Sequence, residues 1–246
     1  MKIYLVGGIL RDRLLNVKSD DYDYVMVLDK TDMSVEEGFH IMDNYMVNEG
    51  YEIFLRTPEM FTIRAKFPKD HKNKGLVADF VLARKEIGYE PGTRRPILEL
   101  GTLKDDLERR DFTVNAMAET IDGQIIDLFN GKQHLTSKIL RTPLPPAKTM
   151  LDDPLRLLRA MRFSITKGMF IDQTILDAIQ LDKRILIKLE EVVSQERIQN
   201  EINKMMKADT YLTIKMLNYW NGLFEGDLLS IVFKGDYWLK MTNEKK

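Results

Sequence analysis

Two glycines and two aspartates near the N-terminus have types and spacing that suit nucleotide chemistry. Gly7 and Gly8 follow an apolar run at residues 3–6, and Asp21 and Asp23 stand two positions apart where a second apolar run begins. Side chains at i and i+2 of a strand point to the same side, so these two carboxylates would repel each other unless a cation lay between them. Paired glycines allow a tight turn, and a helix that starts there presents its free N–H groups to an anion. The stretch predicts a site for a metal-bound nucleoside triphosphate, although an Asp-x-Asp pair alone also arises by chance.

The apolar pattern predicts a small mixed sheet that would position these residues. Ser34 and Glu37 form a capping box for a helix that Gly50 ends. Four short apolar runs predict further strands, at residues 51–54, 61–67, 76–82 and 125–129. Asp79 lies on one of these strands, where it could be a third carboxylate of the site or a structural acid.

Helical patterns replace the strands in the second half of the chain. They fall at residues 153–163, 172–180, 185–193 and 194–206. Pro143, Pro145 and Pro146 are expected to interrupt any regular element between the two halves. We therefore predict an α+β head at residues 1–140 and an all-helical domain at residues 141–246.

The composition is that of a soluble globular protein. The chain has 246 residues, a net charge of −1 and no cysteine, which excludes disulfides, thiolate metal sites and a thiol nucleophile. It contains no apolar run of the roughly 18 residues that a membrane span needs and no signal peptide, so a cytoplasmic location is expected. The charge gives no general attraction to nucleic acid, but six arginine and lysine residues could form a local basic surface: Arg84, Lys85, Arg94, Arg95, Arg109 and Arg110.

The N-terminal motif resembles a known family. The run GGILRDRLL at residues 7–15, followed by DYD at residues 21–23, resembles the first motif of the class II tRNA nucleotidyltransferase and bacterial poly(A) polymerase family. Asn16 stands where the family usually has glycine, and asparagine tolerates the left-handed conformation nearly as well. The resemblance implies a polymerase-β-like head, two Mg²⁺ ions held by Asp21 and Asp23, and triphosphate contacts from Gly8 and Arg11. A surface salt bridge is the alternative role for Arg11.

Four later stretches resemble the remaining motifs of the family in the correct order. They lie at residues 106–117, 126–131, 152–163 and 196–201. Two positions depart from the family: His134 stands where an acidic residue is usual shortly after the second of these stretches, and Asp152 stands where glutamate is usual. The first of them would place Arg110 on phosphate, and Asp111 and Asn115 on ribose or metal-bound phosphate. A solvated charge run is the alternative reading of that stretch.

Asp153 and Arg156 are three residues apart, a spacing that puts both on one face of a helix. A carboxylate accepts from the amino group of cytosine or adenine, and a guanidinium donates to the neighbouring ring acceptor. Uracil and guanine place a carbonyl against the carboxylate and an N–H against the guanidinium, so such a pair could select CTP and ATP over UTP and GTP. The resemblance assigns this role to Asp153 and Arg156. Helix capping by Asp153 ahead of Pro154 is the alternative.

Arg159 and Arg162 lie in the same predicted helix and would contact incoming phosphate or the RNA backbone, with packing and salt bridges as the alternative. The loop at residues 88–96 resembles the flexible loop of CCA-adding and A-adding members, which favours the final A addition.

These features and the resemblance together predict a template-independent CCA-adding enzyme. It would transfer CMP and AMP from CTP and ATP to the 3′ end of RNA, with tRNA as the expected acceptor, and release pyrophosphate. The second domain would be the RNA-binding neck, shortened relative to the family, which leaves an oligomer or a partner open. Three alternatives remain: a poly(A) polymerase or A-adding enzyme on the same scaffold, a catalytically idle RNA-binding member, and a nucleotidyltransferase acting on a protein or small molecule.

Overall fold

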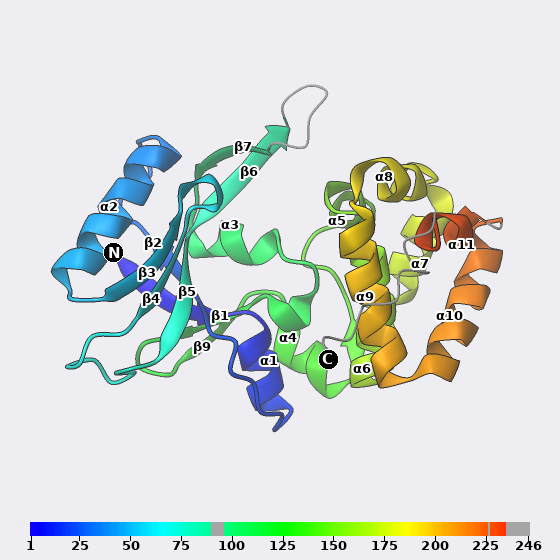
Figure 1. Cartoon of the computed structure of the whole chain (residues 1–246), viewed down its shortest axis with the longest axis horizontal. Helices are drawn as coiled ribbons and strands as arrows, with labels where there is room; N and C mark the ends of the chain where they lie inside the picture. The colour runs from blue at the N-terminus through cyan, green and yellow to red at the C-terminus, as the bar shows by residue number, and fades with distance from the viewer. Residues whose placement is uncertain (90–95, 226, 235–246) are drawn as a thin grey trace, which may run out of the picture. The chain divides into compact units, whose positions relative to one another are not determined.

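The computed structural model describes residues 1–89, 96–225 and 227–234 in two compact units (Figure 1). The first unit comprises Met1–Thr136 and the second Ser137–Lys246. Pro143 and Pro145 lie outside regular structure, as expected, whereas Pro146 is the first residue of a helix, a position to which proline is well suited.

A seven-stranded sheet forms the first unit, in the order β3-β4-β5-β2-β1-β8-β9. Its strands are β1 (Lys2–Val6), β2 (Asp23–Val27), β3 (Glu52–Thr57), β4 (Thr62–Lys66), β5 (Val77–Leu82), β8 (Met117–Thr120) and β9 (Ile125–Asp127). β2 and β5 run parallel and all other neighbours antiparallel, which confirms the mixed sheet. The register places Asp23 directly opposite Asp79.

Alternation along the strands separates two packed faces. Tyr24 and Phe80 belong to the core beneath α2 (Val35–Asn48), whereas Val25 belongs to the opposite face with α3 (Leu103–Glu108). The predicted capping box of α2 is present, and Gly50 follows this helix with a φ of 77°. Since Asp23 is the residue before Tyr24, its side chain belongs to the α3 face of the sheet.

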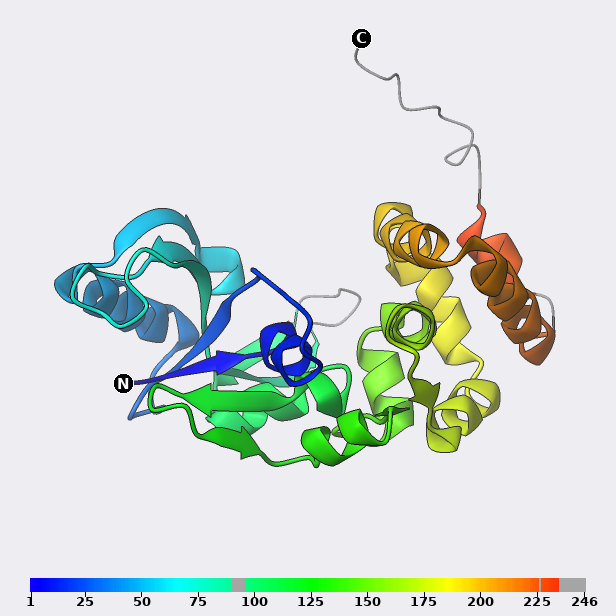
Figure 2. The ribbon, with the colours of Figure 1, turned by 90° about the horizontal axis from the view of Figure 1, so that it is seen from below.

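The remaining elements of the first unit surround this sheet. They are α1 (Gly8–Leu14), η1 (Pro58–Met60), β6 (Arg84–Tyr89), β7 (Pro96–Leu100), η2 (Thr113–Asn115) and α4 (Gly131–Thr136). β6 and β7 form a separate two-stranded ribbon, so Gly88 and Tyr89, expected in a loop, lie in a strand. Residues 90–95 of that loop lie outside the described part of the chain. Figure 2 shows α1 following directly on β1, both in dark blue.

Helices dominate the second unit, as predicted. They are α5 (Pro146–Asp152), α6 (Leu155–Lys167), α7 (Gln173–Leu181), α8 (Arg184–Val192), α9 (Gln195–Ala208), α10 (Thr210–Leu223) and α11 (Asp227–Val232), with short strands β10 (Ile139–Leu140) and β11 (Phe170–Ile171). α6 packs along α9 through fully buried side chains such as Leu158, Met161 and Ile202. Among the described helices, none has the length and apolarity to cross a membrane.

Candidate active site

The turn between β1 and α1 brings a carboxylate and a guanidinium against bare backbone. Gly7 has a φ of 80°, and a Cβ atom built on it would lie 3.1 Å from Nη1 of Arg110 and 3.6 Å from Oδ2 of Asp23. A Cβ on Gly8 would lie 3.2 Å from Nη2 of Arg11. The positive φ favours glycine at Gly7, and a side chain there would also crowd the guanidinium of Arg110.

The helix after this turn is short, as expected. α1 has seven residues, so its dipole supplies little, and the arginines beside the turn are the main positive groups there. The turn is surrounded by positive charge, because Arg110 approaches Gly7 and Arg11 approaches Gly8.

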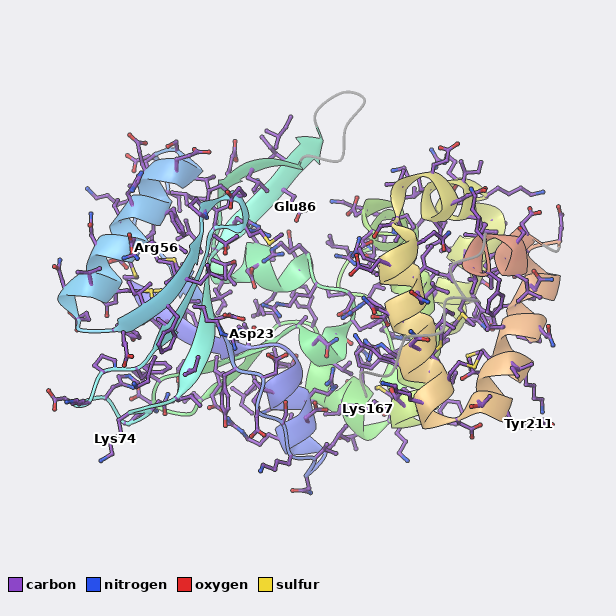
Figure 3. The ribbon with its side chains drawn as sticks, in the orientation of Figure 1. Asp23, Arg56, Lys74, Glu86, Lys167 and Tyr211 are labelled. Atoms are coloured by element: carbon purple, nitrogen blue, oxygen red, sulfur yellow. The ribbon has the colours of Figure 1, made fainter. Side chains whose placement is uncertain are left out.

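Asp23 is the first residue of β2, and its position in the sheet is shown in Figure 3. Asp21 precedes the strand, so the expectation that both aspartates lie on it is wrong. Burial, and then the charge of Asp21, raise the pKa of Asp23 to about 6, although Arg110 acts to lower it. Asp21 is thus close enough to Asp23 to oppose the ionisation of Asp23, as the sequence argument required.

Asp79 lies on the other side of Asp23 and has a partner of its own. Nη1 of Arg64, on β4, lies 3.2 Å from Oδ2 of Asp79. Asp79 adds to the raised pKa of Asp23, but its carboxylate is already engaged in an ion pair. Arg64, which the motif comparison did not single out, therefore competes with any metal for Asp79.

The pair of aspartates fits a divalent cation. A positive ion between the two carboxylates would offset their mutual repulsion and the cost of partly burying their charges. Within the described ranges, no group of three or more His, Asp or Glu side chains could hold a metal ion. Mg²⁺ needs no such cage, because it commonly binds through one or two carboxylates together with water and substrate phosphates.

A polar chain joins α1 to η2 behind the glycine turn. The carboxylate of Asp12 accepts from Nε and Nη2 of Arg11 at 3.0 and 2.7 Å, and Nη1 of Arg11 donates to Oδ1 of Asn115 at 2.6 Å. Nδ2 of Asn115 in turn donates to Oδ1 of Asp111 at 2.9 Å. All four residues are buried, so the structure brings Arg11, Asp111 and Asn115 together as one rigid unit.

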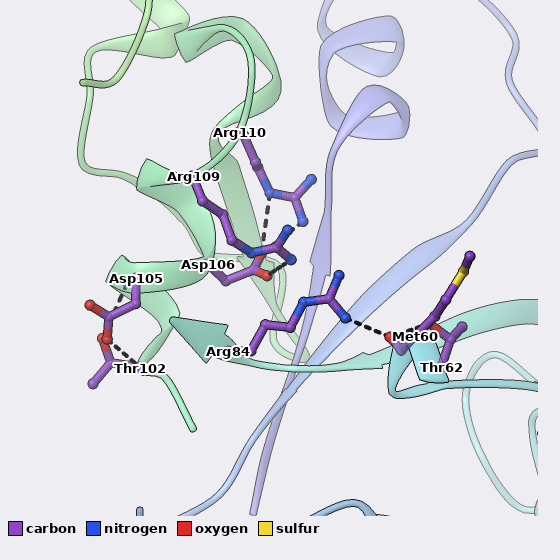
Figure 4. Close-up of polar contacts among 8 residues, drawn as sticks. All are labelled: Met60, Thr62, Arg84, Thr102, Asp105, Asp106, Arg109 and Arg110. Atoms are coloured by element: carbon purple, nitrogen blue, oxygen red, sulfur yellow. Dashed lines mark hydrogen bonds and ion pairs between the residues drawn. The ribbon is translucent and has the colours of Figure 1, made fainter. Parts of the chain in front are cut away.

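Asp106 anchors the two arginines of the second motif. Its carboxylate is fully buried and pairs with Arg109 and with Nη2 of Arg110, the latter at 2.8 Å (Figure 4). Burial acts to raise the pKa of Asp106, but Arg110 and Arg109 outweigh it and hold the pKa below its usual value. Beside this group, Nη1 of Arg84 donates to the carbonyl oxygen of Met60 at 2.6 Å. Asp106 therefore holds Arg110 where it can face the Gly7 turn.

In the second unit, Asp153 lies in the turn between α5 and α6 rather than on a helix. Its backbone is extended, with φ −139° and ψ 98°, so the expectation of a shared helical face with Arg156 is wrong. Oδ1 of Asp153 accepts from the backbone N–H of Leu155 at 3.3 Å, and Oδ2 accepts from Nη2 of Arg197 at 2.9 Å. Arg156 lies in the first turn of α6, and its Nη1 donates to the carbonyl of Thr149 at 3.1 Å. The two predicted base-contacting residues are therefore three positions apart, with Asp153 held by Arg197 of α9 and Arg156 by the backbone of α5.

Arg159 and Arg162 meet a buried carboxylate of α9. Arg162 pairs with Glu201, which also lies 3.9 Å from Arg159 and 3.6 Å from Lys204. The guanidinium carbon of Arg162 lies 4.5 Å from the ring centroid of Phe163. These contacts match the packing alternative for Arg162, and nucleotide contacts by either arginine stay a prediction.

Sequence reasoning missed the partners of the candidate residues. Asp12, Asp106, Arg197 and Glu201 each hold a residue that the motifs had identified. The spacing of Asp106 from Arg109 and Arg110, three and four residues, was a detectable signal for a helical ion pair. No comparable local signal links Asp153 to Arg197, which is 44 residues further along the chain.

A mixed sheet with acidic residues at one strand start, beside a glycine turn and arginines, defines a nucleotidyltransferase head domain. A family model described as the poly(A) polymerase head domain matches residues 3–141. The chain therefore belongs to this family, which is the family of class II tRNA nucleotidyltransferases and bacterial poly(A) polymerases, as the motifs predicted.

Curated relatives are similar along most of the chain. A CCA-adding enzyme of Buchnera aphidicola subsp. Cinara cedri is 34% identical over 236 residues, 91% of this chain and 50% of that protein. The tRNA nucleotidyltransferase cca2 of Schizosaccharomyces pombe is 33% identical over 230 residues, 88% of this chain and 46% of that protein. The chain thus spans about half the length of these relatives.

Solved structures show the same fold. A tRNA nucleotidyltransferase complexed with a primer tRNA and an incoming ATP analogue has a TM-score of 0.67 and 27% identity, and the match covers 95% of this chain and 60% of that one. A CCA-adding enzyme in complex with CTP has a TM-score of 0.65 and 26% identity, with 90% and 48% covered.

Proposed function

We propose that this chain carries out template-independent nucleotidyl transfer, adding CMP and AMP to the 3′ end of tRNA. The observation that carries the proposal is the Gly7 turn, where a Cβ atom built on Gly7 would lie within 4 Å of both Asp23 and Arg110. A carboxylate that would bind a metal ion and a guanidinium that would bind phosphate, both beside one glycine turn, match the two ends of a metal–triphosphate complex.

The residues of the first unit would bind the triphosphate and the metal. Asp21 and Asp23 would hold Mg²⁺, and the chemistry that two such ions supply is a lowered pKa of the attacking hydroxyl and charge neutralisation at the leaving pyrophosphate. Arg110 would hold a phosphate oxygen, while Arg11 with Asp111 and Asn115 would position the ribose and the triphosphate. In the transfer, a bond forms between the RNA 3′ oxygen and the α-phosphorus, and the bond to the pyrophosphate oxygen breaks. Positioning and charge compensation supply most of the catalysis in reactions of this type.

The residues of the second unit would select the base. Asp153 would accept from the exocyclic amino group that cytosine and adenine share, and Arg156 would donate to the adjoining ring acceptor. UTP and GTP would place a carbonyl against the carboxylate and an N–H against the guanidinium, so both contacts would become repulsive. Arg159 and Arg162 would contact phosphate or RNA from positions beside Glu201, with which both interact.

The relatives support tRNA as the acceptor and ATP and CTP as the substrates. Their names refer to CCA addition, and the two similar structures contain a primer tRNA with an ATP analogue, and CTP. A poly(A) polymerase is the second candidate, because the matching family model carries that description.

Incorporation of labelled CTP and ATP tests the proposal directly. The acceptors are tRNA transcripts that lack the terminal CCA, that end after one C and that end after both C residues. Two C additions followed by one A and a stop are expected with Mg²⁺, none with EDTA, and none from an Asp21→Ala/Asp23→Ala variant. Repeated A addition to any RNA end would assign a poly(A) polymerase instead. No incorporation on any acceptor would reject both.

A further inference from the structure

A cavity lies on the face of the sheet opposite the candidate active site. It has a volume of about 340 Å³, and its walls include Tyr24 of β2, Phe67 and the hairpin connection after β4. Because Asp23 and Tyr24 are consecutive residues of a strand, their side chains point to opposite faces. The cavity therefore lies on the other face from Asp23. Arg13 and Tyr22 of the first motif line it, but none of the residues expected to bind metal or nucleotide does.

The walls of this cavity are held in place by hydrogen bonds and ring contacts. Nδ2 of Asn73 donates to the hydroxyl of Tyr24 at 3.1 Å. The backbone N–H of Asn73 donates to Nδ1 of His71, whose ring stacks on Phe67 with centroids 4.5 Å apart. These contacts tie the hairpin connection to the aromatic core, so the cavity is a preformed feature of the fold.

The charge around the cavity is mainly positive. Arg13, Lys72 and Lys74 line it, opposed by Glu119. Nη1 of Arg13 already pairs with Glu119 at 2.6 Å, whereas Lys72 and Lys74 form no ion pair within the described residues. Burial and the charge of Lys72 lower the pKa of the neighbouring His71, which agrees with a locally cationic surface.

We propose that this cavity is a second nucleotide-binding site, which takes one aromatic base bearing a phosphate. Tyr22, Tyr24 and Phe67 provide the apolar walls that a flat base needs, and the two lysines provide the phosphate contacts. The volume lies near the lower end of the range for ligand pockets, roughly 300–1,000 Å³, and so suits a mononucleotide better than a dinucleotide. The same chemistry is presented by a free nucleoside monophosphate and by an unpaired nucleotide of an RNA strand.

Binding and photo-crosslinking on the whole chain test this site. AMP and a short oligo(A) are titrated in EDTA, where metal-dependent binding at Asp21 and Asp23 is suppressed, and an azido derivative of AMP is crosslinked and mapped by mass spectrometry. We expect a crosslink at Tyr22, Tyr24 or His71 that persists in an Asp21→Ala/Asp23→Ala variant. Lys72→Glu/Lys74→Glu should weaken binding by about tenfold or more, since two favourable phosphate contacts become repulsive.

Lys69→Glu is the matched control, because Lys69 is an exposed lysine of the same hairpin connection that does not line the cavity. It should leave binding unchanged. Binding of AMP alone would assign the site to free nucleotide, and binding of oligo(A) alone would assign it to RNA. Crosslinks confined to the Gly7 turn, equal affinities for the double variant and the unaltered chain, or no binding of either probe at millimolar concentration would each overturn the proposal. None of these outcomes depends on whether the chain adds CCA.

Discussion

At the scale of single residues, Asp23 carries an electrostatic cost that a metal ion would relieve. Its pKa is raised to about 6 by burial and Asp21, above the value of about 3.9 for an unfolded carboxyl group. Between these two values the folded state binds more protons than the unfolded state, so this group makes stability fall as the pH rises from about 4 to about 6. The loss then persists at neutral pH.

Asp23→Asn should therefore stabilise the metal-free chain while abolishing nucleotide transfer. We expect a gain of roughly 2 kcal/mol at pH 7.5 and little change near pH 4, because one pKa unit corresponds to about 1.4 kcal/mol and the site is partly exposed. Urea unfolding in EDTA at the two pH values measures this. Asp20→Asn, at an exposed neighbouring aspartate, should show no such pH dependence. A variant less stable than the unaltered chain at both pH values would contradict the assignment.

Asp106 is the opposite case from Asp23, because the charge of this buried carboxylate is stabilised by Arg110 and Arg109. Asp106→Asn should destabilise the chain by about 3–5 kcal/mol, because it removes one charge from a buried network of ion pairs with Arg109 and Arg110. Transfer should also fall, since Arg110 would no longer be held at the Gly7 turn. Denaturant unfolding and single-turnover incorporation measure the two effects. Glu108→Gln on the same helix removes a carboxylate that makes no ion pair within the described residues, and it should change neither.

At the scale of elements, α4 packs so closely on η2 that only glycine fits between them. A Cβ atom on Gly131 would lie 2.4 Å from the carbonyl oxygen of Thr113 and 2.9 Å from Cγ of Met117. Gly131→Ala should cost about 1–3 kcal/mol of stability, and it should weaken nucleotide binding because η2 ends at Asn115.

Gly222→Ala in α10 is the control for this change. No atom lies within 4 Å of a Cβ at that position, and alanine favours a helix over glycine by up to about 1 kcal/mol. Its thermal midpoint should therefore rise or stay constant. Equal losses in the two variants would show that packing against η2 is not the cause.

Arg197 of α9 holds the side chain of Asp153 in the turn between α5 and α6, so replacing Arg197 should change which nucleotides are incorporated. Arg197 holds one oxygen of Asp153, and the pair is partly exposed, so its loss should cost less than about 1 kcal/mol of stability. Arg197→Ala should nevertheless lower the preference for CTP over UTP by about tenfold, because the carboxylate would no longer be fixed. Arg197→Lys should restore part of it. Arg141→Ala, which removes a similarly exposed arginine from an ion pair with Asp172, should leave the preference unchanged.

At the scale of the whole molecule, the two units should contribute separable functions. Asp21→Ala should reduce incorporation of every nucleotide by about a thousandfold or more, because metal binding serves the transfer itself. Arg156→Ala should mainly change the ratio of CTP to UTP incorporation, by about five- to a hundredfold, since a good base contact provides about 1–3 kcal/mol of discrimination. Specificity constants for all four nucleotides decide the matter. A uniform loss in Arg156→Ala would refute base selection by that residue.

The sequence by itself determined the elements and the family. Strand and helix periodicities, the capping box at Ser34 and the glycine turn follow from local rules, because each depends on residues within a few positions of one another. The motifs also identified Arg11, Asp111 and Asn115 before any contact was known, and the structure joins these three residues in one buried chain.

Tertiary structure decided which partner each charged group has. Arg197 meets Asp153 across 44 residues, and Arg64 meets Asp79 through the strand register, so no short-range pattern could indicate either pair. It also decided that Asp21 lies outside the strand and Asp153 outside the helix, because element ends depend on hydrogen bonds that packing permits. The raised pKa of Asp23 and the cationic cavity on the reverse face have the same origin: burial and charge proximity are properties of the folded chain.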